Sequence, residues 1–275
     1  MIMAIVKMRG VWLLAAWGCM GTGGAWAAAS GVDRVSMIAG AEGAANISVT
    51  DGSLLSYSDD HYAATAQSDF GVNRVYASAT DATGGIGAAS VWSDVFTVSG
   101  SSESWVTVTL STLLSGRNEV IGGTVVDLDE SGGEFDLLVY ESPMSPEALL
   151  AQMDEPDNVA FIKVALDAPG VYSQVLSRTL TVRGGSSFYV AGVMALGADR
   201  NQVMDFAHSA HFGIQAGPGV ALTTLSGVVY PSTVPEPGMG VLGLAGCLVL
   251  VWRKGQQRGT RSYASQRTAG MLASH

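Results

Sequence analysis

The stretch Trp105-Val106-Thr107-Val108-Thr109-Leu110 decides the fold of this chain. Apolar and hydroxylated side chains alternate along it, which is typical of a β-strand with one face in a core and the other in water. We therefore expect the two valines and the leucine to point into a core and the two threonines to point outward.

Runs of similar composition recur through the middle of the chain, between breaks rich in Gly, Ser and Asp. Many short strands with hardly any helical periodicity are typical of a mainly β protein, an antiparallel β-sandwich or jelly-roll-like domain. One short helix is predicted at 146–153, because Ser145 can cap it and Pro146 suits its first turn. No fixed repeat divides residues 28–233, so we expect one domain there. Further strands are predicted at 72–80, 91–98, 120–128, 135–140, 159–166, 172–182, 188–196 and 220–230.

Acidic residues are confined to the middle of the chain. The 275 residues carry a formal charge of −10, but residues 30–237 hold all 24 acidic side chains and only seven basic ones, a formal charge of −17. Such a body repels phosphate backbones, which excludes nucleic acid as a partner. Both ends are purely basic beside apolar runs, as expected for membrane topology signals that flank an exported domain.

The amino terminus has the three parts of a secretory signal peptide in order. Lys7 and Arg9 form the positive region, 11–20 is a short uncharged apolar run, and Ala25 and Ala27 form an A-x-A cleavage site. We expect signal peptidase to remove residues 1–27.

Three alternatives remain open for this end of the chain. Cleavage could fall after Ala29, the run could be a membrane anchor or a buried helix, and Cys19 could be the lipidated residue of a lipoprotein. After cleavage at residue 27, the one remaining cysteine is Cys247, which lies in the second apolar run. The exported body then has neither a disulfide nor a catalytic thiol.

The carboxyl terminus carries a second membrane signal. Val234-Pro235-Glu236-Pro237 stands directly before the uncharged residues 238–252, which are followed by Arg253 and Lys254. The prolines favour an extended segment, the uncharged run favours a helix, and the basic pair stops translocation. At 1.5 Å per residue this helix is about 22 Å long, which is short for a bilayer. We expect a single transmembrane helix that holds the protein in the inner membrane for a time.

This arrangement resembles the PEP-CTERM sorting signal of Gram-negative bacteria. The resemblance implies that an exosortase, a membrane-embedded cysteine protease, cuts near the motif and passes the body to the cell surface or extracellular polymer. It covers 234–258 and leaves 259–275 as a basic cytoplasmic tail, longer than usual for such signals; an ordinary single-span anchor is the alternative. The matching residues are Val234, Pro235, Glu236 and Pro237 for the motif, and Arg253 and Lys254 for the basic end.

The body also resembles, loosely, the uncharacterised β-rich domains often found upstream of this signal. The stretches that carry this resemblance are 61–79, 90–98 and 205–231. It implies fold and destination but no active site.

The densest acidic cluster begins like a calcium loop. Asp127, Asp129 and Ser131 have suitable spacing, but the closing acid of an EF-hand would fall at Leu138. A solvated hairpin tip between two strands is the preferred interpretation, with a calcium site as the alternative.

Two other groups of polar residues could form functional sites. His208 and His211 would share one face of a helix but point to opposite faces of a strand, and no third zinc ligand lies nearby. Asp60 and His61 lie in a stretch, 59–62, that could supply a general acid or base, yet such neighbours are common in loops. We expect no metal site and no catalytic residue at either.

Aromatic side chains could instead form a platform for stacking sugars, although aromatics in strands also fill cores. The candidates are Tyr57, Tyr62, Tyr76, Trp92 and Trp105.

The sequence therefore predicts a non-enzymatic protein of the cell surface or extracellular matrix, processed by signal peptidase and an exosortase-like protease. A glycan-binding or calcium-assisted adhesive module, with extracellular polysaccharide as its partner, is the alternative. A secreted hydrolase of matrix polymer is a third possibility.

Overall fold

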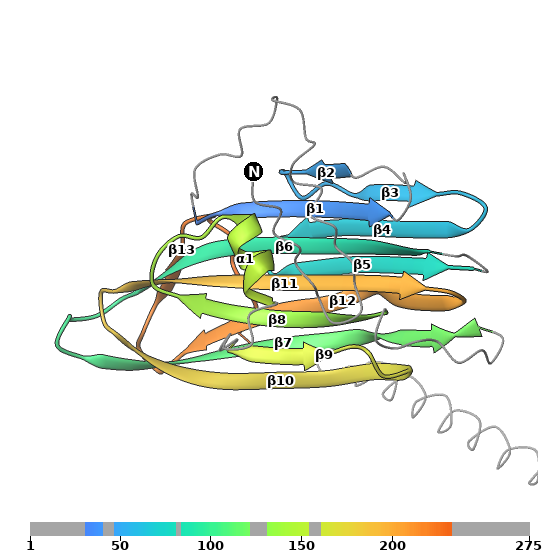
Figure 1. Ribbon diagram of the computed structural model, residues 1–275. Helices are drawn as coiled ribbons and strands as arrows, with labels where there is room; N and C mark the ends of the chain where they lie inside the picture. The colour runs from blue at the N-terminus through green and yellow to red at the C-terminus, as the bar shows by residue number, and fades with distance from the viewer. Residues whose placement is uncertain (1–30, 41–46, 81–83, 122–130, 154–160, 233–275) are drawn as a thin grey trace, which may run out of the picture. The chain divides into compact units, whose positions relative to one another are not determined.

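The computed structural model describes residues 31–40, 47–80, 84–121, 131–153 and 161–232, and these form thirteen strands and one helix (Figure 1). All neighbouring strands in the two sheets run antiparallel, which confirms the prediction of a mainly β fold. The predicted signal peptide, residues 1–27, and the predicted transmembrane segment, 238–252, lie outside the described residues. Within the described part, no helix has the length and apolar character needed to cross a membrane.

We call the two sheets the β6 sheet and the β7 sheet. The β6 sheet has seven strands in the order β2-β1-β6-β11-β8-β9, with β13 also paired to β6. The β7 sheet has six strands in the order β10-β7-β12-β5-β4-β3. The strands of the β6 sheet are β1 (Asp33–Gly40), β2 (Ile47–Val49), β6 (Gly85–Val98), β8 (Gly132–Tyr140), β9 (Ile162–Ala165), β11 (Ser187–Asp199) and β13 (Leu222–Thr224). Those of the β7 sheet are β3 (Leu55–Ser58), β4 (Tyr62–Asp69), β5 (Val72–Ala79), β7 (Trp105–Val120), β10 (Gly170–Arg183) and β12 (Gln202–Ala216).

The chain changes sheet at almost every step from β5 to β12. Only β8 and β9 are consecutive strands of the same sheet, and the helix α1 (Pro146–Met153) lies between them in the chain. The resulting orders, β6-β11-β8-β9 and β10-β7-β12-β5, are those of a jelly roll, in which two Greek keys place the strands of each sheet far apart in sequence.

The main core fills the space between the two sheets. Val106, Val108 and Leu110 are buried in it and Thr107 is exposed, so the alternation of β7 was read correctly. Trp92 is also buried there, and its Nε1 donates a 2.9 Å hydrogen bond to Oδ1 of Asn73. The amide of Asn73 in turn donates to two oxygens of Ser90 in the opposite sheet. This satisfied polar network joins the two sheets inside the core.

The β6 sheet has a second apolar layer on its outer face, which α1 covers; Figure 1 shows this helix over the strands of the sheet. Small side chains of β6 and β11, among them Ala89, Val91 and Val193, face this layer, and Leu149 and Met153 of α1 pack on it. The helix has the predicted bounds, and the Ser145 hydroxyl accepts a 3.3 Å hydrogen bond from a backbone N–H of its first turn.

Several strands differ from those expected. β7 runs to Val120, whereas a separate strand was predicted from residue 120, and only 222–224 of the predicted strand 220–230 pair in a sheet. The strands β1 to β4 and β12 lie outside the predicted ones. These strands are short, or carry polar residues on both faces; β12 also shifts register between Phe206 and Ala210, which interrupts the period of two that reveals a strand.

Candidate functional site

The residues of both predicted sorting signals lie outside the described part of the chain. These are Ala25 and Ala27 of the predicted signal peptidase site, Val234, Pro235, Glu236 and Pro237 of the predicted motif, and Arg253 and Lys254 of the predicted membrane stop. The chain divides into two compact units, 1–235 and 236–275, and this boundary falls inside the motif. The described body ends at Ser232, two residues before the motif begins.

The last described segment, 222–232, is fixed to the body; we call it the C-terminal strap. Asp94 lies fully buried on β6 and accepts a 2.9 Å hydrogen bond from the hydroxyl of Tyr230. The same carboxylate accepts hydrogen bonds from the hydroxyl and the backbone N–H of Ser226. Burial, and then the charge of Asp94, raise the pKa of Tyr230, so this phenol stays protonated and able to donate.

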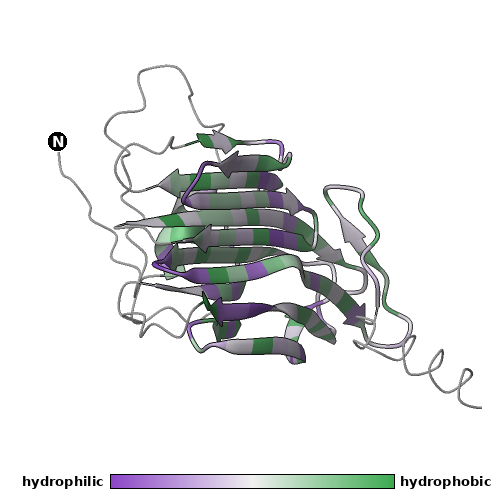
Figure 2. Cartoon of the chain, turned by 90° about the vertical axis from the view of Figure 1, so that its right-hand side faces the viewer, coloured by the Kyte–Doolittle hydropathy of each residue, from purple (hydrophilic) through white to green (hydrophobic). Residues whose placement is uncertain are grey.

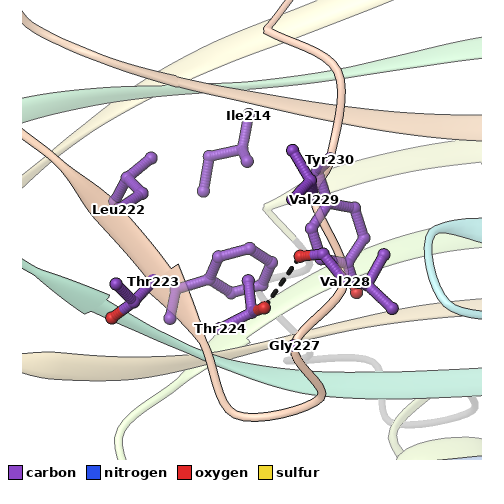
Figure 3. A pocket seen from close by; sticks show the side chains of 9 residues that line it. Ile214, Leu222, Thr223, Thr224, Gly227, Val228, Val229 and Tyr230 are labelled. Carbon is purple, nitrogen blue, oxygen red and sulfur yellow. Dashed lines mark hydrogen bonds between the residues drawn. The ribbon is translucent and has the colours of Figure 1, made fainter.

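The strap forms one wall of an open pocket of about 360 Å³ on the β-sandwich (Figure 3). Its lining is mostly apolar, and the strap is braced across it by a 2.8 Å hydrogen bond from the Thr224 hydroxyl to the carbonyl of Val228. No Asp, Glu, His, Lys or Arg lines this pocket, so it has no acid, base or charged group for chemistry. The lining residues are Phe96, Ile214, Leu222, Thr223, Thr224, Gly227, Val228, Val229 and Tyr230.

The acid–base candidate at 59–62 is a structural turn between β3 and β4. Oδ1 of Asp59 accepts hydrogen bonds from the backbone N–H groups of His61 and Tyr62, at 2.8 and 2.7 Å. The hydroxyl of Tyr57 donates to Oδ2 at 2.7 Å. These hydrogen bonds lower the pKa of Asp59, and the one from Tyr57 has the largest effect. The carboxylate therefore shapes the turn and is a poor proton carrier.

The calcium candidate falls largely outside the described residues. Asp127 and Asp129 are not described, and Ser131 is buried at the start of β8. The prediction of a hairpin tip was wrong, because β7 and β8 belong to different sheets and β8 pairs with β11 and β9. In the described ranges no three His, Cys, Asp or Glu residues converge to hold a metal ion.

The two candidate histidines lie on β12. His211 pairs with Val72 and Leu113 in the β7 sheet, whereas His208 falls where the register of β12 shifts. The segment is therefore a strand with an irregularity, so the two histidines do not share one face of a helix.

The five aromatic candidates do not form one platform. Trp92 belongs to the core, and Tyr57 and Tyr62 pack against that core from β3 and β4. Trp105 is 65% exposed at one end of β7, with the guanidinium of Arg183 over its ring at 5.1 Å. Tyr76 pairs with Asp205, whose other partner is Arg117 near the opposite end of β7. The idea of a shared aromatic surface was therefore wrong.

A surface of hydroxyl groups follows Trp105 along β7 and β10. Cross-strand pairs place threonine opposite threonine and serine opposite serine on the outer face of the β7 sheet, and we call this set the hydroxyl face. Successive pairs on one face lie about 6.8 Å apart along the strands, and the strands are about 4.8 Å apart. Bands of differing hydropathy cross the strands in Figure 2, as this alternation requires. The pairs are Thr107 with Thr181, Thr109 with Thr179, Ser111 with Ser177, and Ser115 with Ser173.

Sequence reasoning missed a carboxyl pair on the outer face of the β6 sheet. Glu134 and Asp136 are two residues apart on β8, and Nζ of Lys163 lies 2.7 Å from Glu134 and 4.0 Å from Asp136. Burial, and then the charge of Glu134, raise the pKa of Asp136 to about 8. The spacing Glu-x-Asp places both carboxyl groups on one face of a strand, and this was the signal in the sequence that could have revealed the pair. The lysine beside them, Lys163, comes from β9, so no local motif includes it.

Comparisons with known proteins identify no relative. No protein-family model, curated protein or solved structure matches the chain.

Proposed function

We propose that this protein is exported and acts without catalysis at the cell surface or in the extracellular matrix. Signal peptidase removes residues 1–27, and an exosortase-like membrane protease sorts the body. The observation that carries this proposal is the order of three elements: Val234-Pro235-Glu236-Pro237, the uncharged residues 238–252, and Arg253-Lys254. Basic residues after an apolar segment remain on the cytoplasmic side, which places the motif at the outer surface of the inner membrane.

The described body supports this proposal because it is complete before the motif begins. Tyr230 is anchored in the core, and the carbonyl of Pro231 accepts a 3.0 Å hydrogen bond from the N–H of Ile214. Cleavage near Glu236 therefore removes no strand of the sandwich. The transient membrane protein becomes a released or transferred body with its core intact.

The test replaces Pro235-Glu236-Pro237 by three alanines, because alanines extend the following helix and remove the carboxylate. In a host with an exosortase, the wild type should reach the surface or medium without its carboxyl-terminal helix and tail, as read by mass spectrometry. The alanine variant should stay full-length in the inner membrane. A matched control, Gly238→Ala with Gly240→Ala, leaves the motif intact and should be processed. Recovery of Met271–His275 on all three proteins would show a simple anchor instead.

A second candidate function, binding of neutral glycan, is favoured by the hydroxyl face. Among its described residues, the stretch between Arg183 and Arg117 presents hydroxyl groups with no Asp, Glu or Lys, although the body as a whole is acidic. Trp105 offers an exposed ring at one end. Aromatic rings and hydroxyls are suitable partners for uncharged sugars.

A glycan array probed with residues 28–233 tests this candidate. Binding that is lost in Trp105→Ala but kept in Leu225→Ala, a control at a similarly exposed apolar side chain of the C-terminal strap, supports it. Absence of binding to every neutral polymer rejects it and leaves the sorting proposal untouched.

A further inference from the structure

Among the described strands, one of the four sheet edges is long, and the other three are short. The β6 sheet ends in β2 and β9, of three and four residues, and the β7 sheet ends on one side in β3, also of four residues. The remaining edge is β10, whose fourteen residues all pair in register with β7 (Figure 1). Short edge strands protect a sheet against pairing with other chains, and β10 lacks this protection.

The hydrogen bonds at the ends of the ladder show which groups of β10 are open. Gly184 donates its N–H to the carbonyl of Ser104, the next pair beyond Arg183 and Trp105. Bonding directions alternate along an antiparallel ladder, so even-numbered residues of β10 bond to β7 and odd-numbered residues point the other way. The bond from Gly217 to the carbonyl of Thr107 agrees, because odd-numbered residues of β7 bond to β12. The residues that present N–H and C=O groups to the open edge are Val171, Ser173, Val175, Ser177, Thr179 and Thr181, whereas the carbonyl of Arg183 accepts hydrogen bonds from Ser186.

The sequence of β10 has few of the features that block edge pairing. It has no proline, lysine or acidic residue, and its register with β7 shows no bulge. Val171 is 84% exposed and Val175 is 43% exposed, although both lie on this edge strand. Arg178 and Arg183 are its only charged residues.

We propose that β10 pairs antiparallel with β10 of a second copy of this chain, with Leu176 at the two-fold axis. In a continuous sheet, side chains that point to one face must lie opposite side chains that point to the same face. The numbers of two paired β10 residues must therefore add up to an even number. Pairing about Leu176 places Gln174 opposite Arg178 and Tyr172 opposite Leu180. Pairing about Arg178 opposes two like charges, and pairing about Ser177 places leucines opposite polar side chains.

The chemistry of β10 favours a second copy over another partner strand. Antiparallel edge pairing is two-fold symmetric, so one sequence supplies both sides of the contact. The overlap of 170–182 with itself spans about 44 Å at about 3.4 Å per residue. One strand width over that length is smaller than the ~1,200 Å² of stable complexes, so the dimer is reversible and depends on concentration. It joins two six-stranded β7 sheets into one continuous sheet.

The first test measures self-association of the full chain in mild detergent by sedimentation. The wild type should shift from monomer to dimer as its concentration rises. Ser177→Pro removes an open N–H and Ser177→Lys adds an edge charge, and each should weaken dimerisation by about tenfold or more. The control Thr107→Lys, on the same face but one strand inside the edge, should dimerise like the wild type. A monomer at all concentrations, or a dimer unaffected by both Ser177 variants, overturns the proposal.

The second test fixes the register by disulfide formation. In a full chain with Cys19→Ser and Cys247→Ser, Val175→Cys of one copy should lie opposite Ser177→Cys of another. The mixture of these two variants should therefore cross-link on mild oxidation far more than either variant alone. Equal cross-linking in all three samples overturns the register about Leu176.

Discussion

The outer faces of the two sheets differ although both sheets are built from antiparallel strands around one core. On the β6 sheet, the outer side chains of β6 and β11 are small and apolar, and they are buried beneath groups that include Leu149 and Met153 of α1. On the β7 sheet, the outer side chains of β7 and β10 are mainly hydroxylated and open to solvent. One face therefore contributes to stability, and the other is available for contacts with a partner.

This difference follows from the period of the sequence in each strand. Gly85–Val98 and Ser187–Asp199 are almost continuously buried, because both faces of these strands meet apolar layers. Trp105–Val120 alternates, because only one of its faces is covered. A continuous apolar run in a jelly roll thus marks a strand with a second covering layer.

The largest expected effect comes from a charge placed on each outer face. Val193→Asp buries a carboxylate at a fully buried position of β11, and should lower the free energy of unfolding by about 4 kcal/mol or more. Thr107→Asp places the same group on the exposed face of β7 and should change it by less than about 0.5 kcal/mol. Urea denaturation of residues 28–233 measures both. Similar losses for the two variants would show that the β7 sheet is also covered.

Truncation of the covering helix should have the next largest effect. Leu149 is fully buried between α1 and the β6 sheet, so Leu149→Ala should cost about 3 kcal/mol through lost burial and an unfilled cavity. Leu113→Ala on the half-buried outer row of β7 is the matched control and should cost clearly less. Thermal denaturation distinguishes them, and an equal loss would mean that α1 contributes nothing beyond an ordinary surface contact.

The pH dependence of stability should reveal the carboxyl pair beneath the covered face. The pKa of Asp136 is about 8 in the folded chain, whereas its usual value is about 4. Between these two pH values the folded state therefore binds one proton more than the unfolded state. The stabilisation is fully present below about pH 4 and is lost as pH rises through about 8, by up to about 1.4 kcal/mol per pH unit. Asp136→Asn cannot ionise and should remove this slope. A slope that persists unchanged in Asp136→Asn would assign it to other groups.

Loss of the exposed tryptophan should have the smallest effect on stability. Trp105 is 65% exposed, so Trp105→Ala should lower the free energy of unfolding by less than about 1 kcal/mol. Trp92→Ala, its buried counterpart, should cost about 4 kcal/mol because it also leaves Oδ1 of Asn73 without its donor. Denaturation followed by circular dichroism compares them. A large loss in Trp105→Ala would mean that this ring is a structural element of the hydroxyl face.

The parts of the fold that could be predicted are those with a local cause. The alternation of Trp105–Leu110 and the cap at Ser145 depend on neighbouring residues, and the structure confirms both. The hydrogen bonds from Ser226 and Tyr230 to Asp94 join residues that are 132 and 136 positions apart, so no local sequence pattern could predict them. Which aromatic residues are exposed also depended on the pairing of distant strands, since Trp92 and Trp105 occupy similar apolar runs.

The C-terminal strap has a mechanical consequence. Tension on the chain beyond Ser232 would reach Pro231 and then Tyr230, whose ring packs 5.1 to 6.1 Å from the rings of Trp92, Phe96 and Phe212. The next paired element toward the amino terminus, β13, has only three paired residues, so it adds little resistance once the ring of Tyr230 is extracted. The load is therefore held at one buried point beside Asp94, and we expect such an attachment to yield abruptly rather than peel residue by residue.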